Sequence, residues 1–315
     1  MIESGSHRPG VFARDFGLPD HTALRYEQPA PALRELLPSY AVLDSEEGFA
    51  HTDESWMLPS WAMIWIILAE APISVSVGNR HYSKLSTAIL YGVTSRAMPV
   101  ISNGGVTIAI DISPLGWARF FRESAETLRD RITPLEEVLP AELVEELVHR
   151  LYYSDRALEV KGILDDIFTR ALPPEHRDEP LIADIMKIVT AKGTTDLRAA
   201  ATQIGIQPLK LRRLSQRYFG FPPKILLMRA RFLRVFLEMM ISPDHAHEAV
   251  LTSVYFDRSH FLRDAKRFLG MTPRQFMDMN VEYLTAALRA RRLVLGVPTP
   301  SLDVPPLAAD VLETR

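Results

Sequence analysis

The sequence contains no cysteine among its 315 residues. Disulfide bonds, thiolate metal sites and cysteine nucleophiles are therefore excluded, and because reduced compartments suit such a chain, we expect a cytoplasmic protein. Long hydrophobic runs are also missing: the longest, residues 61–69, is about half the length that crosses a bilayer. The N-terminus lacks the apolar stretch of a secretory signal, so we expect no contact with a membrane.

Patterns that carry common catalytic chemistry are absent as well. No glycine-rich phosphate loop and no Gly-x-Ser-x-Gly elbow occurs. The six histidines before residue 180 are scattered, and the one closely spaced pair, His245 and His247, has no evident third ligand. We therefore predict no catalytic residue, no metal and no cofactor, and a protein that is not an enzyme.

Charge is divided unevenly along the chain, although the formal net charge is only −3. Residues 181–280 hold 16 Lys and Arg against 8 Asp and Glu, whereas residues 1–180 hold 16 against 27. A basic segment joined to an acidic one indicates that only the basic segment binds a polyanion. The length predicts about two domains, and 47% hydrophobic residues are enough for two cores.

Residues 1–135 have the pattern of short strands. Residues 73–77 alternate apolar and polar, and Gly78 and Asn79 follow as a turn, while residues 88–93 and 106–110 are further predicted strands. Beyond them, Leu143, Leu147 and Leu151 recur every four residues and predict an amphipathic helix within a connecting region, 136–172. The proline-rich residues 173–180 are predicted to be a linker.

From residue 181 the pattern is helical, and a repeat with an offset of fifty residues stands out. Residues 211–223 align with residues 261–273, so that Gly220 matches Gly270 and Pro223 matches Pro273. In each copy the glycine suits the left-handed end of one helix, and the proline suits the first turn of the next, with Thr272 as an N-cap. Upstream, residues 199–208 predict a short helix, a glycine turn and a second helix. This layout is a helix-turn-helix, whose second helix enters the DNA major groove.

Residues 181–280 resemble the AraC/XylS family of transcription regulators, most clearly over residues 255–276. The resemblance implies an α+β protein with a β-rich, cupin-like N-terminal domain and an all-α C-terminal domain. The latter would contain two helix-turn-helix units, at about 196–220 and 246–270, and residues 281–315 would form a C-terminal helix and a tail that is loose beyond about residue 292. The departures from the family pattern are Val254 and Val250 in the second unit, and Gln207 and Ser215 in the first. A valine at a turn that favours positive φ predicts distortion of the second unit.

The resemblance also implies which side chains touch DNA. The candidates for base contacts are Leu209, Arg212, Arg213, Arg258, Ser259 and Arg263. Arginine can bind guanine through two hydrogen bonds, and leucine can press on a thymine methyl group. The candidates for phosphate contacts are Lys210, Arg217, Lys224, Lys266 and Arg274. Any of these cations can instead belong to a solvated helix face or to an internal ion pair.

The first half resembles the β-rich sensory domain that precedes some of these DNA-binding modules, over residues 25–117 and 133–135. Such domains bind a small effector or mediate dimerisation. The candidates for lining an effector pocket are Trp56, Trp61, Trp65 and Tyr91, although aromatic residues are more often simply core. Leu143, Leu147 and Leu151 are candidates for a dimer helix, and packing within their own domain is the alternative.

These observations predict a one-component regulator of transcription that binds double-stranded DNA. The resemblance to the AraC/XylS family favours an activator that responds to a small molecule or partner. Such a protein would contact RNA polymerase and form a homodimer. Two alternatives stay open. One is a metal-dependent cupin-type enzyme tethered to DNA, and the other is a dimeric DNA-binding protein that takes no effector.

Overall fold

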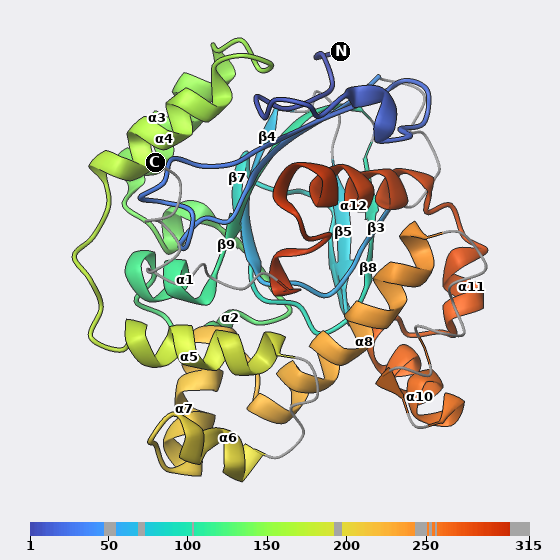
Figure 1. Cartoon of the computed structure of the whole chain (residues 1–315). Coiled ribbons are helices and arrows are strands. Elements are labelled where there is room, and N and C mark those ends of the chain that lie inside the picture. The colour runs from blue at the N-terminus through green and yellow to red at the C-terminus, as the bar shows by residue number, and fades with distance from the viewer. Residues whose placement is uncertain are drawn as a thin grey trace.

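The chain folds into a β-rich N-terminal part and a helical C-terminal part, as the sequence predicts (Figure 1). The structure is a computed structural model and describes residues 1–46, 55–68, 73–102, 104–191, 197–242, 251, 254–255 and 257–302. His245, His247 and Val250 lie outside the described residues.

Two antiparallel sheets form the N-terminal part. The strands are β1 (Thr22–Glu27), β2 (Tyr40–Ser45), β3 (Ser55–Met57), β4 (Ala62–Leu68), β5 (Ser74–Val77), β6 (Arg80–Tyr82), β7 (Ala88–Tyr91), β8 (Met98–Ile101), β9 (Gly105–Ile112) and β10 (Ile132–Pro134). The larger sheet has the order β1-β2-β9-β4-β7-β10, and the smaller sheet has the order β3-β8-β5-β6. Gly78, with φ +61°, allows the tight turn between β5 and β6.

Helices follow from residue 114 onward. They are α1 (Pro114–Phe120), α2 (Ala125–Leu128), α3 (Ala141–Tyr152), α4 (Val160–Arg170), α5 (Glu179–Thr190), α6 (Leu197–Gln203), α7 (Pro208–Phe219), α8 (Pro223–Ile241), α10 (Arg258–Phe268), α11 (Pro273–Met277) and α12 (Glu282–Leu295). Short 3-10 turns occur at Ala13–Asp15, Leu135–Glu137 and Pro300–Leu302. The start of α1 is typical: the Ser113 side chain accepts from the Gly116 N–H, and Pro114 occupies the first turn.

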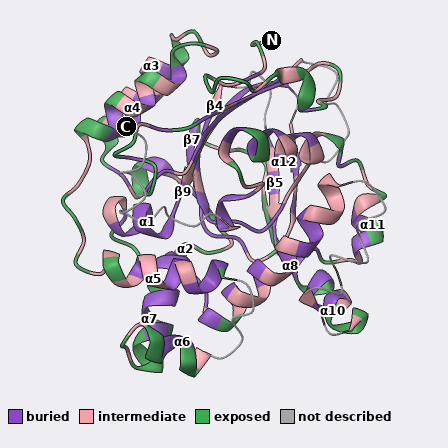
Figure 2. Ribbon diagram, viewed as in Figure 1, coloured by how far each residue is buried: buried purple, intermediate pink, exposed green. Residues whose placement is uncertain are grey.

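The amphipathic stripe on α3 packs within its own chain. Leu147 and Leu151 are completely buried, and Leu143 is partly buried against the same core. That core also includes residues of β4, β9, α4, α5 and α7, so it continues from the larger sheet into the first half of the helical part (Figure 2). Leu147 and Leu151 are therefore covered by the chain itself in this conformation, and Leu143 is covered in part.

Close packing joins the two parts. Arg119 of α1 binds both carboxylate oxygens of Glu179 of α5. Residues 293–302 of the expected loose tail are packed in the structure, where Val294, Thr299 and Ser301 are buried, and residues 303–315 lie outside the described residues. The proline-rich composition suggested a free tail, but the Pro300 carbonyl accepts a 2.9 Å hydrogen bond from the Trp61 indole. This tertiary hydrogen bond holds residue 300 in place although the surrounding sequence is rich in proline.

Candidate nucleic-acid interface

The first helix-turn-helix unit consists of α6, a turn at Gly205 and α7. Gly205 has φ +67°, a conformation that glycine adopts without the steric penalty of a side chain. Pro208 begins α7, and Gln207 occupies the N-cap position without a capping hydrogen bond from its side chain. The helix ends at Gly220, with φ +73°, as the repeat predicted.

The exposed face of α7 carries the side chains predicted to contact DNA. Leu211 and Leu214 are buried, whereas Arg212 and Arg213 are exposed, and Leu209 is 59% exposed. Lys210, Arg217 and Lys224 are also exposed. Within the described part of the chain, no ion pair engages Arg212 or Arg213. Their charges therefore point to solvent without an internal partner.

The second unit presents α10 in a comparable way. Asp257 caps this helix by accepting from the N–H of His260 at 3.0 Å and from the Ser259 hydroxyl at 2.5 Å. These hydrogen bonds hold the pKa of Asp257 below its usual value. Arg258 and Arg263 are exposed on the same helix. Ser259, predicted to contact a base, is thus engaged at the helix start, and the acidic residue before the helix is the sequence signal for this cap.

The C-terminal end of α10 has the same glycine and proline pattern as the end of α7. Gly270 has φ +82°, and Pro273 begins α11. Thr272 and Gln275 form a reciprocal capping box, which confirms Thr272 as the N-cap. Lys266 and Arg274, predicted to contact phosphates, are both exposed, and Arg274 lies 3.8 Å from Asp278.

Val254 does not adopt the strained turn that the sequence suggested. It is helical, and the non-glycine residues with positive φ in the described ranges are His21 and Asp130. Tyr255, next in the chain, is buried and donates a 2.8 Å hydrogen bond to Asp264. A valine is therefore accommodated because the backbone here stays in the region that valine favours.

A buried acidic residue orients α10 and was not singled out from the sequence. Asp264 is 4% exposed and accepts from Arg231 of α8 at 2.6 Å and from the Tyr255 hydroxyl. The Arg231 guanidinium also lies 4.8 Å from the Tyr255 ring centre. This cluster fixes α10 against α8. In the sequence, the sign of this buried cluster is an acidic residue that stands between the apolar residues Phe261 and Phe268.

The four aromatic residues proposed for an effector pocket do not form one cluster. Trp65 and Tyr91 lie together, with ring centres 4.6 Å apart, between the two sheets. Trp61 and Trp56 instead face the helical part, where Trp61 contacts Phe219 and Trp56 contacts Phe276. Two of the four candidates are thus inside the β-rich part, and the other two join it to the DNA-binding helices.

No group of three His, Asp or Glu residues in the described ranges is placed to hold a metal ion. In the same ranges, no helix has the length and hydrophobicity to cross a membrane.

The helix-turn-helix unit of α6 and α7 and the second exposed cationic helix, α10, fit an architecture that binds duplex DNA, while residues 243–250 of the second predicted unit lie outside the described residues. Residues 200–279 match the helix-turn-helix domain family. The chain accordingly carries an AraC-type helix-turn-helix domain and is a DNA-binding transcriptional regulator.

Comparison with solved structures gives distant similarities. An apo variant of ToxT from Vibrio cholerae is 11% identical, covers 83% of this chain and 98% of its own, and has a TM-score of 0.44. Unsaturated fatty acid bound wild-type ToxT is 11% identical, covers 72% and 90%, and has a TM-score of 0.40. The AraC-like transcriptional activator CuxR is 10% identical, covers 69% and 88%, and has a TM-score of 0.26. None of the curated protein sequences matches this chain.

Proposed function

We propose that this regulator activates transcription when a small apolar effector binds its β-rich part, and that both helix-turn-helix units read DNA together. The observation that carries the DNA-reading part is the exposure of Arg212, Arg213, Arg258 and Arg263 on α7 and α10. None of these four forms an ion pair with another described residue. Cations held on rigid helices without internal partners are available for a polyanion.

Different side chains have different tasks in this proposal. Arg213 and Arg263 occupy equivalent positions of the repeat and read guanines, and the other proposed base contacts are Leu209, Arg212, Arg258 and Ser259. The phosphate contacts are Lys210, Arg217, Lys224, Lys266 and Arg274, which position the protein without reading sequence. Because the two recognition helices carry different side chains, the site on DNA is asymmetric. Its two halves lie about one helical turn apart, roughly 34–36 Å.

The effector site that we propose lies between the two sheets, around Trp65 and Tyr91. The Tyr91 hydroxyl is buried and has no hydrogen-bond partner among the described residues. Its surroundings, which include Ile73, Val75 and Met98, are apolar. A buried polar atom without a partner is unfavourable, so a ligand with one hydrogen-bonding group in an otherwise apolar body suits this place.

We include contact with RNA polymerase, a homodimer and a cytoplasmic location in the proposal. The α3 leucines are not offered as the dimer interface, since Leu147 and Leu151 are completely buried in their own chain.

In vitro transcription tests the proposal as a whole. A duplex enriched from a random-sequence pool by the full-length protein is placed upstream of a promoter, and transcripts are counted with RNA polymerase and a panel of apolar metabolites. We expect more transcript in the presence of the protein, and a further change with one class of metabolite. Enrichment of a duplex without any effect on transcription would leave DNA binding in place and contradict activation.

A further inference from the structure

One face of the larger sheet is shared between the smaller sheet and a helix from the far end of the chain. The strand register places Tyr26, Ala41, Ala109, Trp65 and Ile89 in one row across the sheet, each directly opposite the next. Residues directly opposite each other on paired strands point to the same face. Trp65 and Ile89 pack against the smaller sheet, whereas Tyr26 and Ala41 pack against α12. Ala109 contacts both groups.

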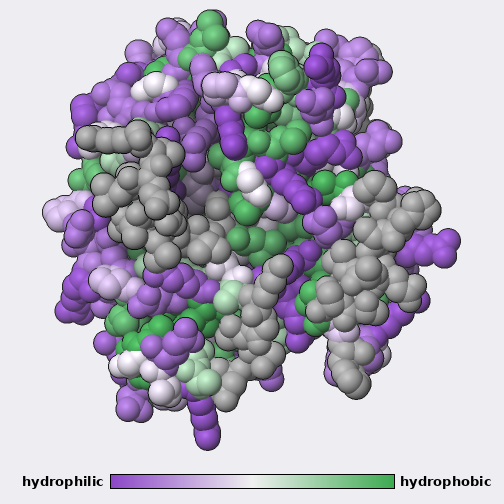
Figure 3. Space-filling model, viewed as in Figure 1, coloured by the Kyte–Doolittle hydropathy of each residue, from purple (hydrophilic) through white to green (hydrophobic). Residues whose placement is uncertain are grey.

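Helix α12 fits this face closely because its contacting residues are small. Ala290 and Val294, four residues apart, lie in one cluster with Ala41 of β2 and are at most 1% exposed. Opposite them, Phe16 and Leu24 are completely buried. In Figure 1, α12 lies in front of the sheets, and Figure 3 shows hydrophobic residues gathered along the middle of this side of the molecule.

Polar contacts fix the helix in one position on the sheet. Arg291 is 3% exposed, lies 3.5 Å from the Asp111 carboxylate and donates to the Val297 carbonyl at 2.8 Å. Ser39 also donates to Asp111, and burial raises the pKa of this carboxyl although Arg291 opposes the shift. Two residues earlier on the same helix, Arg289 donates to the Phe16 carbonyl at 3.1 Å.

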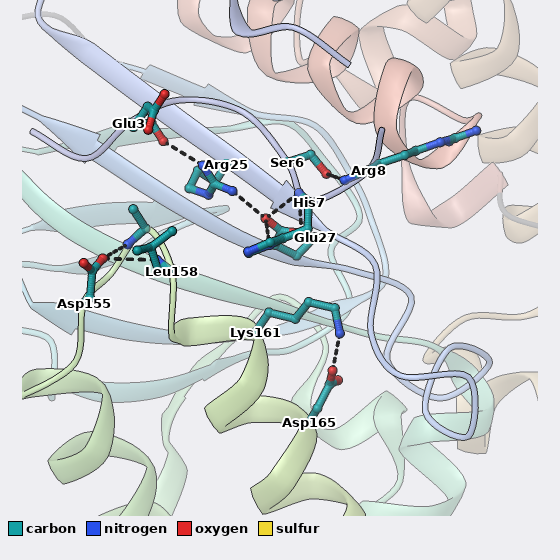
Figure 4. A network of polar contacts seen from close by, with 11 residues as sticks. Glu3, Ser6, His7, Arg8, Arg25, Glu27, Asp155, Leu158, Lys161 and Asp165 are labelled. Carbon is teal, nitrogen blue, oxygen red and sulfur yellow. Dashed lines mark hydrogen bonds and ion pairs between the residues drawn. The ribbon is translucent and has the colours of Figure 1, made fainter. Parts of the chain in front are cut away.

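The N-terminal arm, which includes His7 and Arg8, also holds the C-terminal end of α12. Glu27 of β1 is buried and binds both Arg25 and His7, which anchors the arm to the larger sheet (Figure 4). From this anchored arm Arg8 extends away from Glu27 (Figure 4). Its guanidinium donates to the carbonyl of Val294 on α12. The arm and the sheet thus hold α12 from two sides.

The same helix belongs to the core of the second helix-turn-helix unit. Leu288 is buried in a cluster with Phe261, Phe268 and Phe276. Only residues 278–281 separate α11 from α12. The position of α12 on the sheet therefore contributes to where the second unit lies, together with the direct contact between Trp56 and Phe276.

We propose that the β1-β2-β9 face is a docking site for α12, and that this docking holds the second helix-turn-helix unit in position to bind DNA beside the first. This inference rests on the proposed DNA binding and says how docking of α12 would regulate that binding. Helix α12 lies beyond the matched domain, which ends at residue 279. With α12 docked, Arg213 and Arg263 both remain exposed, so the docked state leaves the DNA-reading faces uncovered. A ligand that enters the sheet from the Trp65 side reaches α12 through Ala109.

The absence of cysteine makes a direct test available. Ala290→Cys places the only thiol of the full-length chain on the docked face, where Ala290 is completely buried. Leu293→Cys is the matched control, because Leu293 is 42% exposed on the same helix. In the free protein, we expect a maleimide to modify the thiol at position 290 at least about tenfold more slowly than the thiol at 293, since docking restricts access. Equal rates would overturn the docking site.

Reversal of the charge at position 111 then tests whether docking of α12 affects the affinity for DNA. Asp111→Arg places two cations together, so it should release α12 and abolish the protection of the thiol at position 290. Binding of the duplex enriched from a random-sequence pool should weaken about tenfold or more, because two linked units lose their combined affinity when one is free to move. Adding Arg291→Asp should restore both protection and affinity, which separates release of α12 from general unfolding.

The outcomes distinguish the inference from the proposed function. Release of α12 with DNA affinity unchanged within twofold would overturn the inference and leave DNA binding intact. Protection of the thiol together with no enrichment of any duplex would contradict the proposed function and the link to DNA, while the docking site itself would stand.

Discussion

The guanidinium of Arg229 lies 4.5 Å from the centre of the Trp61 ring, at the junction between α8 and the β-rich part. Arg229 is 2% exposed and donates to the carbonyls of Ser60 at 3.1 Å and Thr94 at 3.2 Å. Burial lowers its pKa to about 9, although Asp130 opposes the shift. Since α8 connects the two helix-turn-helix units, this side chain joins the β-rich part to the DNA-binding helices.

Arg229→Lys should destabilise the chain although it keeps the charge. Lysine has no planar guanidinium to stack on Trp61 and to bind two carbonyls together. We expect the free energy of unfolding in urea to fall by about 2 kcal/mol. The control is Arg212→Lys, an exposed position where we expect a change within about 0.5 kcal/mol. Equal stability of the two variants would show that the Arg229 contacts contribute nothing net.

The repeat provides a second matched pair, Gly220 and Gly270. Both have positive φ, so alanine at either position should cost about 1–2 kcal/mol through backbone strain. At Gly220 a Cβ would also lie 2.1 Å from a methyl group of Val93, whereas at Gly270 it would meet no other described residue within 4 Å apart from its chain neighbours. Gly220→Ala should therefore cost about 1–3 kcal/mol more than Gly270→Ala. Urea unfolding measures both.

Adding Val93→Ala to each alanine variant identifies the cause. It should recover part of the loss in Gly220→Ala and none in Gly270→Ala. Equal losses for both glycines would contradict the contact between the first unit and the β-rich part.

The Arg119–Glu179 pair predicts a pH dependence of stability. Burial alone would raise the pKa of Glu179, but hydrogen bonds from Arg119 and from the His176 N–H hold it below its usual value of 4.5. A lowered folded-state pKa contributes stability above about pH 4.5, and this contribution is lost as pH falls through the folded-state value. Glu179→Gln should thus cost about 1–3 kcal/mol at pH 7. The gap to the unaltered chain should narrow below pH 4.5, and a gap that stays constant with pH would contradict this account.

Tyr91→Phe tests the effector site. Because the hydroxyl is buried and unpartnered in the described structure, its removal should leave the melting temperature of the free protein unchanged or slightly raised. An apolar metabolite that stabilises the unaltered chain should stabilise the variant less. A ligand at 100 times its dissociation constant gives about 2.7 kcal/mol, so thermal shifts detect the difference. An unchanged shift would place the effector elsewhere.

Local chemistry explains which parts of this molecule could be predicted. The turn at Gly205 and the ends at Gly220 and Gly270 depend on backbone angles that glycine favours, so the sequence shows them directly. Strand β4 likewise follows from its apolar run, since it spans Ala62–Leu68.

The contacts between parts were not predictable in the same way. Trp61 and Trp65 are four residues apart, which suggests one face of a strand, yet Trp61 precedes β4 and turns toward Phe219. The hydrogen bond from Trp61 to Pro300 joins residues 239 positions apart, and the composition of the tail gives no sign of it. Nor does the alanine-rich face of α12 identify the sheet that it covers.

Binding to genomic DNA is the most direct test of the central claim that two helix-turn-helix units read DNA together. The full-length protein, Arg213→Ala and Arg263→Ala are each incubated with fragmented genomic DNA at about 0.15 M salt, and the retained fragments are sequenced. We predict a few sharp peaks upstream of genes for the unaltered protein. Each variant should relax the preference at different bases of the same asymmetric site, with a loss of about 1–3 kcal/mol. Diffuse binding that is the same for all three proteins would contradict the account.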